Sequence, residues 1–243
     1  MEGTEVTGVT EVPRAEGAGI SREKLEVPRG AILQRDKKTY AIVPRLGTAG
    51  LMDVDTLRRL ADVAEEFSIP VIKITGAQRI ALVGLKAEDV EEVWNRLNME
   101  PAPAVGPCVR YVTACPGTVT CTYGQQDALG LAGELEKRHL GRHELGSKFK
   151  IGISGCPINC CEAYLRDFGA FGKAKGWTVA IGGRAGARPR IGDKLVENVS
   201  SDEVMELVER TIKVYAELGK KGERLGTSIE RIGFKEYRKR ILS

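Results

Sequence analysis

The 243-residue sequence contains no run of about 20 apolar residues, the length that a membrane-spanning helix needs. Its first 30 residues lack both the basic segment and the apolar segment of a secretory signal, so we expect a cytoplasmic protein. The net charge is only +4, and the basic residues are spread among 33 acidic ones, which argues against nucleic acid as a partner. We therefore expect a soluble chain that binds neither membranes nor nucleic acid.

Histidine is also scarce. The two histidines, His139 and His143, lie around the end of a predicted helix, and we interpret them as structural or surface residues. A hydrophobic content of 42% and a charged content of 29% are typical of a folded protein with a substantial core. The length allows one large domain or two small ones.

Hydrophobic patterning divides the chain into three parts. Residues 1–35 show no sustained period, and we predict a flexible arm. Residues 36–102 alternate short apolar runs with helical patterns, an order that is typical of a compact α+β unit. In this part we predict strands at 40–43, 71–74 and 79–83 and helices at about 55–67 and 87–97.

A cluster of prolines and glycines near residue 103 marks the start of the last part, 103–243. Its pattern again mixes strands and helices, so the whole chain reads as α+β. We predict strands at 109–112 and 148–153, a hairpin at 168–181, and helices at 125–139, 157–166, 202–218 and 228–241.

Four cysteines form two spaced pairs, Cys115 with Cys121 as C-x5-C and Cys156 with Cys160 as C-x3-C. In a reducing compartment, such cysteines are more often metal ligands or free thiols than disulfides. The C-x5-C spacing lies outside the short knuckles of structural zinc sites, whereas the ligands of an iron–sulfur cluster only have to reach its corners. We favour a cluster, and zinc or metal-free thiols remain the alternatives.

Pro157 is well placed as the first residue of a helix. Positions four apart share a helix face, so this helix would point Cys156 and Cys160 to one side and rotate Cys161 away. The prediction therefore selects Cys160 over its neighbour. We interpret Cys108 and Cys161 as packed thiols.

Two lysines precede the second cysteine pair on one face of a predicted strand. Alternate residues of a strand share a side, so Lys148 and Lys150 point the same way. The opposite side is apolar and is the expected core face: Phe149, Ile151 and Ile153. Two cations are thus aimed together shortly before a predicted metal ligand.

Further basic residues occupy comparable places. Arg110 stands five residues before Cys115, and Arg79 follows a tight turn of the first part. Together with the two lysines, they suggest a cationic pocket for a small oxyanion or for cofactor carboxylates. A loop rich in glycine carries Arg184, Arg188 and Arg190, whose guanidinium groups are suited to binding anions.

These motifs resemble those of the sulfite and nitrite reductases that contain sirohaem coupled to a [4Fe–4S] cluster. The resemblance covers residues 36–243 and is not limited to the cysteines. It extends to Lys148-Phe-Lys150, to Asn159 before Cys160, to Arg188-Pro-Arg190 after a Gly-Gly loop, and to the closing segment 223–233. It implies a small ferredoxin-like half-domain at 36–102, followed by an α/β domain that binds sirohaem and the cluster at 103–243.

The resemblance also implies roles for single residues. It assigns the four cysteines Cys115, Cys121, Cys156 and Cys160 to the cluster, with Cys160 bridging to the sirohaem iron. It assigns four basic residues to binding and protonating the oxyanion: Arg79, Arg110, Lys148 and Lys150. It assigns four others to cofactor contacts: Gln78, Asn159, Arg184 and Arg188.

Two features differ from the common family pattern. Many members carry an arginine just before the glutamine of the first-domain turn, whereas here Ala77 precedes Gln78 and Arg79 follows it. This form of the turn resembles the NADH-dependent bacterial nitrite reductases. Large assimilatory members contain two copies of the domain pair, and this chain has one, as in the small single-copy sulfite reductases.

We predict a reductase that converts sulfite to sulfide, with reduction of nitrite to ammonia as the first alternative. A [4Fe–4S] electron-transfer subunit without sirohaem is the second alternative. No glycine motif for a dinucleotide follows a strand, and there is no second cluster motif, so we expect an external electron-donor protein. The sequence leaves open whether the chain forms a homo-oligomer.

Overall fold

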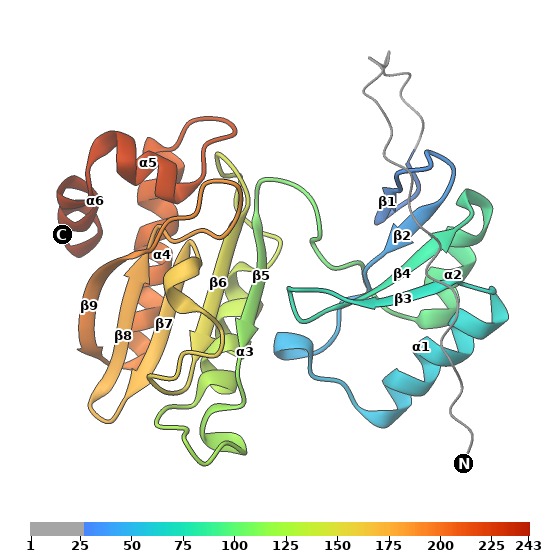
Figure 1. The fold of residues 1–243 in the computed structure, drawn as a ribbon, viewed down its shortest axis with the longest axis horizontal. Coiled ribbons are helices and arrows are strands. Elements are labelled where there is room, and N and C mark those ends of the chain that lie inside the picture. Colours follow the sequence, from blue (N-terminus) through green and yellow to red (C-terminus); the bar gives the residue numbers. More distant parts are fainter. Residues whose placement is uncertain (1–26) are drawn as a thin grey trace.

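The first part of the chain folds around a four-stranded antiparallel sheet with the order β1-β2-β4-β3. The computed structural model describes residues 27–243. Two helices cover one face of this sheet (Figure 1). The elements are β1 (Ala31–Leu33), β2 (Tyr40–Ile42), α1 (Val54–Glu66), β3 (Val71–Ile74), β4 (Ile80–Leu85) and α2 (Val90–Leu97), with short 3-10 helices at Thr48–Gly50 and Ala87–Asp89.

Local chemistry explains the helices of this domain. The Asp53 side chain accepts a hydrogen bond from the backbone N–H of Thr56 at 2.7 Å and so caps the start of α1. Leu60 and Val63 then share the core with Trp94 of α2. The predicted arm lies largely outside the described residues. Its described end contains β1, which pairs with β2, so the first sheet begins before residue 36.

The second part is built on a five-stranded sheet with the order β5-β6-β7-β8-β9. Strands β5, β6 and β7 run parallel, and β7, β8 and β9 run antiparallel. The strands are β5 (Val109–Ala114), β6 (Phe149–Ser154), β7 (Phe168–Lys173), β8 (Gly176–Ile181) and β9 (Asp193–Val199). The helices are α3 (Ala128–His139), α4 (Ser201–Leu218), α5 (Leu225–Ile232) and α6 (Phe234–Leu242), with 3-10 turns at Gly117–Val119 and Ala163–Leu165.

Helices α3 and α4 lie against the same face of this sheet (Figure 1). Phe149, Ile151 and Ile153 of β6 are fully buried there, which confirms the core face that strand alternation predicts. The opposite face of β5 and β6 carries Tyr111 and Lys150. The two helices leave this second face uncovered, and the β3–β4 turn of the first domain borders the cavity there.

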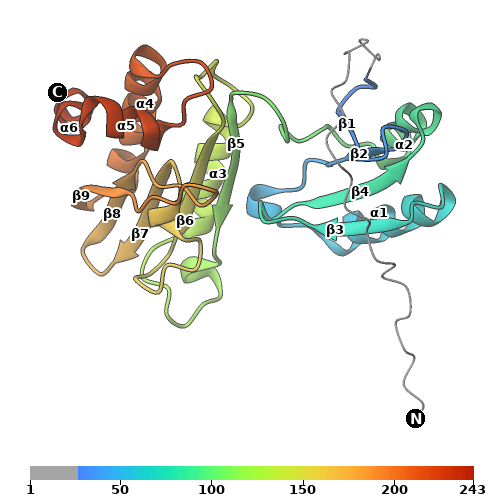
Figure 2. The ribbon, with the colours of Figure 1, turned by 45° about the horizontal axis from the view of Figure 1, so that its top comes forward.

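The domains meet at the β3–β4 turn, which reaches the free edge of β5 (Figures 1 and 2). The Gln78 side chain donates to the backbone oxygen of Ala114 and accepts from its N–H, both at 3.0 Å. A β-carbon at Gly50 would lie 2.2 Å from the Gln78 carbonyl oxygen, and its φ of +81° also requires glycine. The β3–β4 turn is therefore fixed by the Gln78 side chain on β5 and by the close approach of Gly50 to the Gln78 backbone.

The predicted helix 157–166 is wrong. Residues 155–162 form consecutive turns, and the only helical segment of this loop is the 3-10 turn at 163–165. Asn159 and Glu162 have φ values of +60° and +55°, in the left-handed region that an α-helix excludes. The Asn159 side chain accepts from the N–H of Ala163 at 2.9 Å and closes a turn instead.

The closing helix is also divided. Gly233, with a φ of +102°, separates α5 from α6 where the periodicity predicts one helix over 228–241. The structure contains two strands that the sequence analysis did not predict, β1 and β9. Among the helices of residues 27–243, none is both long and apolar enough to cross a membrane.

Candidate cofactor and anion site

The two cysteine loops lie side by side at one edge of the second sheet. Parallel strands end at the same edge, so Cys115 after β5 and Cys156 after β6 are brought together. The N–H of Gly155 donates to the Cys115 sulfur at 3.1 Å, a contact that ties the two loops together. A β-carbon on Gly155 would come within 2.6 Å of the Gly117 α-carbon, so glycine is what lets the loops touch.

The second loop presents its cysteines differently from a helix. Cys156 and Cys161 are buried, and Cys160 is exposed. The backbone N–H of Cys161 donates to the Ser154 hydroxyl at 2.9 Å. Burial, and then the neighbouring Cys115, raise the pKa of the Cys161 thiol to about 12, which keeps it protonated. Because residues 157–162 are not helical, helix phase cannot select Cys160 over Cys161. The structure still distinguishes the two neighbours, since Cys160 is exposed and Cys161 is buried.

Within residues 27–243, no three cysteine, histidine or acidic side chains converge on a single point suited to one metal ion. A [4Fe–4S] cluster distributes its ligands over four irons, so its thiolates stand around a larger body than one ion. Two touching loops that carry the four cysteines, three of them at least partly accessible, fit that requirement.

A cavity of about 670 Å³ opens beside the second cysteine loop, between the domains. Its walls come from the β3–β4 turn, from the uncovered face of β5 and β6, and from the loop after β6. The lining residues are Thr75, Gly76, Ala77, Gln78, Tyr111, Thr113, Lys150, Cys160, Cys161, Glu162 and Arg166. A cavity with thiols on one wall and cations on another fits an iron tetrapyrrole that carries carboxylates.

Two cations flank the ring of Tyr111 at this cavity. The Lys150 ammonium lies 5.2 Å from the ring centre, and the Arg166 guanidinium lies 5.9 Å from it. Burial lowers the pKa of Lys150, and the positive charge of Arg224 lowers it further. Lys150 is therefore a better proton donor than a lysine in water.

Asp167 contacts the backbone of Lys150, and Arg224 contacts Asp167. Asp167 is fully buried and accepts from Arg224 Nε at 3.0 Å, from Arg224 Nη2 at 2.5 Å and from the backbone N–H of Lys150 at 2.9 Å. Burial raises the pKa of Asp167, while Arg224 acts against that rise. Three donors on one carboxylate favour its ionised form.

A second cavity, of about 800 Å³, adjoins the start of the same two strands. Arg110, Lys148 and Lys221 line it, together with the backbone of several glycines. Burial lowers the pKa of Lys148, and so do Lys150, Arg224 and Arg110, which shows that these cations face one another. The structure thus brings Arg110, Lys148 and Lys150 to one region, with Lys150 in the first cavity and the other two in the second.

Arg79 points elsewhere. Its guanidinium donates to the carbonyl oxygens of Pro103 and Arg110, on the segment that joins the domains. Burial lowers its pKa. Arg79 therefore fixes the linker to β5 and does not line either of the two cavities described above.

The arginine loop is also committed to internal contacts. Arg184 pairs with Glu230 of α5 at 3.2 Å and donates to the Arg188 carbonyl at 2.6 Å. Arg190 pairs with Asp193 at 2.5 Å. Arg188 is exposed. Of these three arginines, Arg188 is the one whose side chain shows no ion pair among the described contacts.

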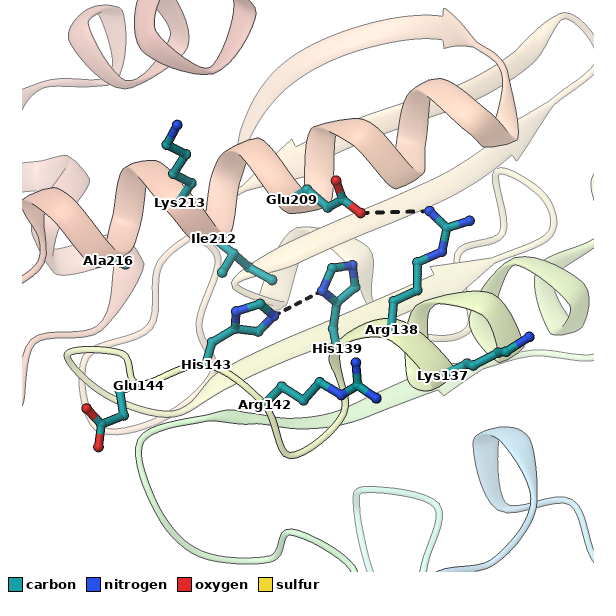
Figure 3. A pocket seen from close by; sticks show the side chains of 10 residues that line it. All are labelled: Lys137, Arg138, His139, Arg142, His143, Glu144, Glu209, Ile212, Lys213 and Ala216. Atoms are coloured by element: carbon teal, nitrogen blue, oxygen red, sulfur yellow. Dashed lines mark hydrogen bonds and ion pairs between the residues drawn. The ribbon is translucent and has the colours of Figure 1, made fainter.

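His139 is the last residue of α3, and His143 follows it in the next loop; both line a cavity that contains none of the cysteines (Figure 3). His139 Nδ1 lies 3.1 Å from His143 Nε2, and His139 Nε2 is buried without a partner among the described residues. Burial, and then His143, lower the pKa of His139 to about 4. The ring is therefore neutral at pH 7, and its surroundings agree with a structural role.

The sequence analysis did not identify Tyr111, Arg166, Asp167 and Arg224 as site residues. Tyr111 and Arg166 lie close to residues that it did select. Strand phase alone would have placed Tyr111 on the side of the core residue Val109, and the register irregularity between these two residues of β5 turns Tyr111 to the other face. Arg224 is 57 residues from Asp167 in sequence, and no periodic pattern joins them.

Comparisons with known proteins agree with this arrangement. Residues 105–243 match the family model for the nitrite and sulphite reductase 4Fe-4S domain, and residues 32–100 match the nitrite/sulfite reductase ferredoxin-like half domain. An assimilatory-type sulfite reductase of Nitratidesulfovibrio vulgaris is 46% identical over 215 residues, which is 88% of this chain and 98% of that protein. A nitrite reductase [NAD(P)H] of Bacillus subtilis is 37% identical over 84% of this chain, but that stretch is only 25% of the longer protein.

Solved structures share the fold. Dissimilatory sulfite reductase I gives a TM-score of 0.75 at 17% identity, covering 84% of this chain and 69% of that chain. The NirA protein of Mycobacterium tuberculosis gives 0.73 at 22% identity, covering 84% and 39%. The α+β architecture and the family predicted from the motifs are confirmed, and the chain belongs to the nitrite and sulphite reductase family of enzymes.

Proposed function

We propose that this chain reduces sulfite to sulfide at a sirohaem coupled to a [4Fe–4S] cluster. The observation that carries the proposal is the cavity that Lys150, Arg166 and Cys160 line together. A simple electron carrier has no need of such a cavity beside its cluster. The relative of nearly equal length, 98% covered, is named an assimilatory-type sulfite reductase, which favours sulfite.

Cys115, Cys121, Cys156 and Cys160 hold the cluster in this proposal. The exposure of Cys160 at the cavity supports its role next to the sirohaem, and the raised thiol pKa of Cys161 supports its exclusion from the ligand set. Asn159 shapes the turn that separates Cys156 from Cys160.

The cofactors supply the electrons that break the S–O bonds when they are bound. The chain supplies position, positive charge and protons. Lys150 and Arg166 stabilise negative charge on substrate oxygens, and the Lys150 ammonium donates protons as each oxygen leaves as water. Arg110 and Lys148, in the adjoining cavity, bind the incoming dianion.

The remaining predicted contacts take narrower roles. Gln78 forms part of the cavity wall while it ties the β3–β4 turn to β5. Arg79 and Arg184 act as structural ties, and Arg188 is the exposed guanidinium that is left for a cofactor carboxylate. Electrons reach the cluster from a separate donor protein.

Nitrite is the second candidate substrate. The Ala77-Gln78-Arg79 turn resembles that of NADH-dependent nitrite reductases, and a nitrite reductase of Bacillus subtilis is 37% identical to this chain. Turnover of sulfite and of nitrite by the reconstituted enzyme with a reduced low-potential dye separates the two. We expect the larger kcat/KM for sulfite, and a larger value for nitrite would reverse the assignment.

The Lys150→Ala variant tests the role of the ammonium. Both cofactor absorption spectra should remain, and turnover should fall by about 100-fold or more, the range for a lost proton donor. Lys175→Ala, in the exposed β7–β8 turn, is the matched control and should keep wild-type turnover. Absence of sirohaem bands after expression with cofactor supply would favour the electron-transfer subunit instead.

A further inference from the structure

The buried carboxylate of Asp167 lies next to Lys150 and Arg224. It is the only acidic residue with no exposed surface among residues 27–243. Its three hydrogen bonds come from two nitrogens of Arg224 and from the main chain of Lys150. A charge in this place costs desolvation unless it is paired, and Arg224 pairs it. Through these bonds, Asp167 links Arg224, the residue before α5, to Lys150, the second residue of β6.

Lys150 faces charges from every element around it. Arg110 and Tyr111 come from β5, and Lys148 precedes β6. Asp167 and Arg166 come from the loop before β7, and Arg224 lies at the start of α5. Glu162 also lines the cavity, but it is exposed and pairs with Arg166. Asp167 is therefore the one buried negative charge set against four cations that act on the lysine.

We propose that Asp167 and Arg224 are positioning residues of the anion site. Asp167 fixes the main chain of Lys150 and supplies the counter-charge that keeps its ammonium protonated between turnovers, and Arg224 holds that carboxylate in place. The inference rests on the proposed function, because a proton donor must regain its proton before each new step. Neither residue touches the substrate in this scheme.

The pair has an electrostatic signature that a purely structural role lacks. Removing the negative charge of Asp167 leaves the surrounding cations uncompensated, so the protonated lysine becomes less stable. Removing the positive charge of Arg224 takes one cation away from Lys150 and leaves the lysine as the remaining charged partner of the buried Asp167, so the protonated lysine becomes more stable. Simple loosening of the site would instead admit water in both cases and move both variants in the same direction.

Competitive acetylation of the intact holoenzyme measures this signature without using turnover. The pH dependence of trace acetylation at Lys150, read by mass spectrometry of the peptide that contains it, gives a titration midpoint for that one amine. We expect Asp167→Asn to lower the midpoint by about one pH unit and Arg224→Gln to raise it by about one. The double variant should return close to the wild type.

Controls separate charge from damage to the fold. Asp193→Asn removes a carboxylate that pairs with an arginine at the same 2.5 Å but lies outside the groups that act on Lys150, so its midpoint should stay unchanged. Arg224→Lys keeps the charge and should lie near the wild type. If one of the two charge-changing single variants does not fold, the midpoint shift of the other still decides, with Asp193→Asn and Arg224→Lys as its unshifted references.

Shifts of the same sign in Asp167→Asn and Arg224→Gln, or shifts no larger than that of Asp193→Asn, overturn the proposal. The alkaline limb of the turnover profile should move with the acetylation midpoint. If the wild type reduces neither sulfite nor nitrite, the proposed function fails, yet opposite midpoint shifts would still establish the charge pairing. The two failures are therefore distinguishable.

Discussion

Removing the Gln78 side chain tests how the two domains are joined. Its amide makes two hydrogen bonds of 3.0 Å to the backbone of Ala114, at the free edge of β5. Ala114 is only 5% exposed, so water does not easily replace the lost partner. At about 1 kcal/mol net for each bond, Gln78→Ala should weaken the local structure by about 2 kcal/mol.

Amide hydrogen exchange at Ala114 is the direct assay. A loss of about 2 kcal/mol corresponds to roughly 30-fold faster exchange through local opening. The amide of Ile151, inside the sheet, should keep its wild-type rate. Gln78 has a φ of +54°, and Gln78→Asn retains a residue suited to that conformation while shortening the side chain. It should match Gln78→Ala. Unchanged exchange at Ala114, or recovery in the asparagine variant, would refute the reasoning.

Two further predictions concern the cysteines and the histidine pair. Cys161→Ser should keep the cluster absorption and iron content, whereas Cys121→Ser should lose most of both; loss of iron in the first variant alone would transfer the ligand role to Cys161. His139 has a folded pKa of about 4 against 6.5 when unfolded, so the unfolded state binds more protons between these values. Stability should be full above pH 6.5 and fall by roughly 3 kcal/mol as the pH drops to 4. Urea midpoints of wild type and His139→Phe measure this, and an equal pH slope in both would contradict it.

Strand alternation predicted the most important placement in the site. The period of two along β6 separates Phe149 and Ile151 from Lys148 and Lys150, and the structure keeps that separation because one side of the strand contacts α3 and α4. Motif spacing identified the family, and parallel pairing of β5 with β6 then explains why distant cysteines meet. Strand alternation and motif spacing involve residues close together in the sequence, so both can be read from the sequence alone.

The wrong helix prediction and the contacts that the sequence analysis missed depend on features that a sequence does not display. The helix from Pro157 was plausible by its first residue, but Asn159 closes a left-handed turn with its own side chain. Arg184 has the chemistry of an anion ligand, yet Glu230 on a later helix already occupies it. Arg224 has no signal of its own until folding places it against Asp167.

The interdomain cavity belongs to neither hydrophobic core. One wall is the β3–β4 turn of the first core, and the others belong to the second, so its width follows the docking of two bodies joined at residues 101–107. Retention of a cofactor there then depends on how the two domains dock against each other. Substitutions in the linker, or at its anchor Arg79, should alter cofactor residence time without touching the cofactor. The width of such a site can be changed by substitutions at the domain junction while the residues that line it stay the same.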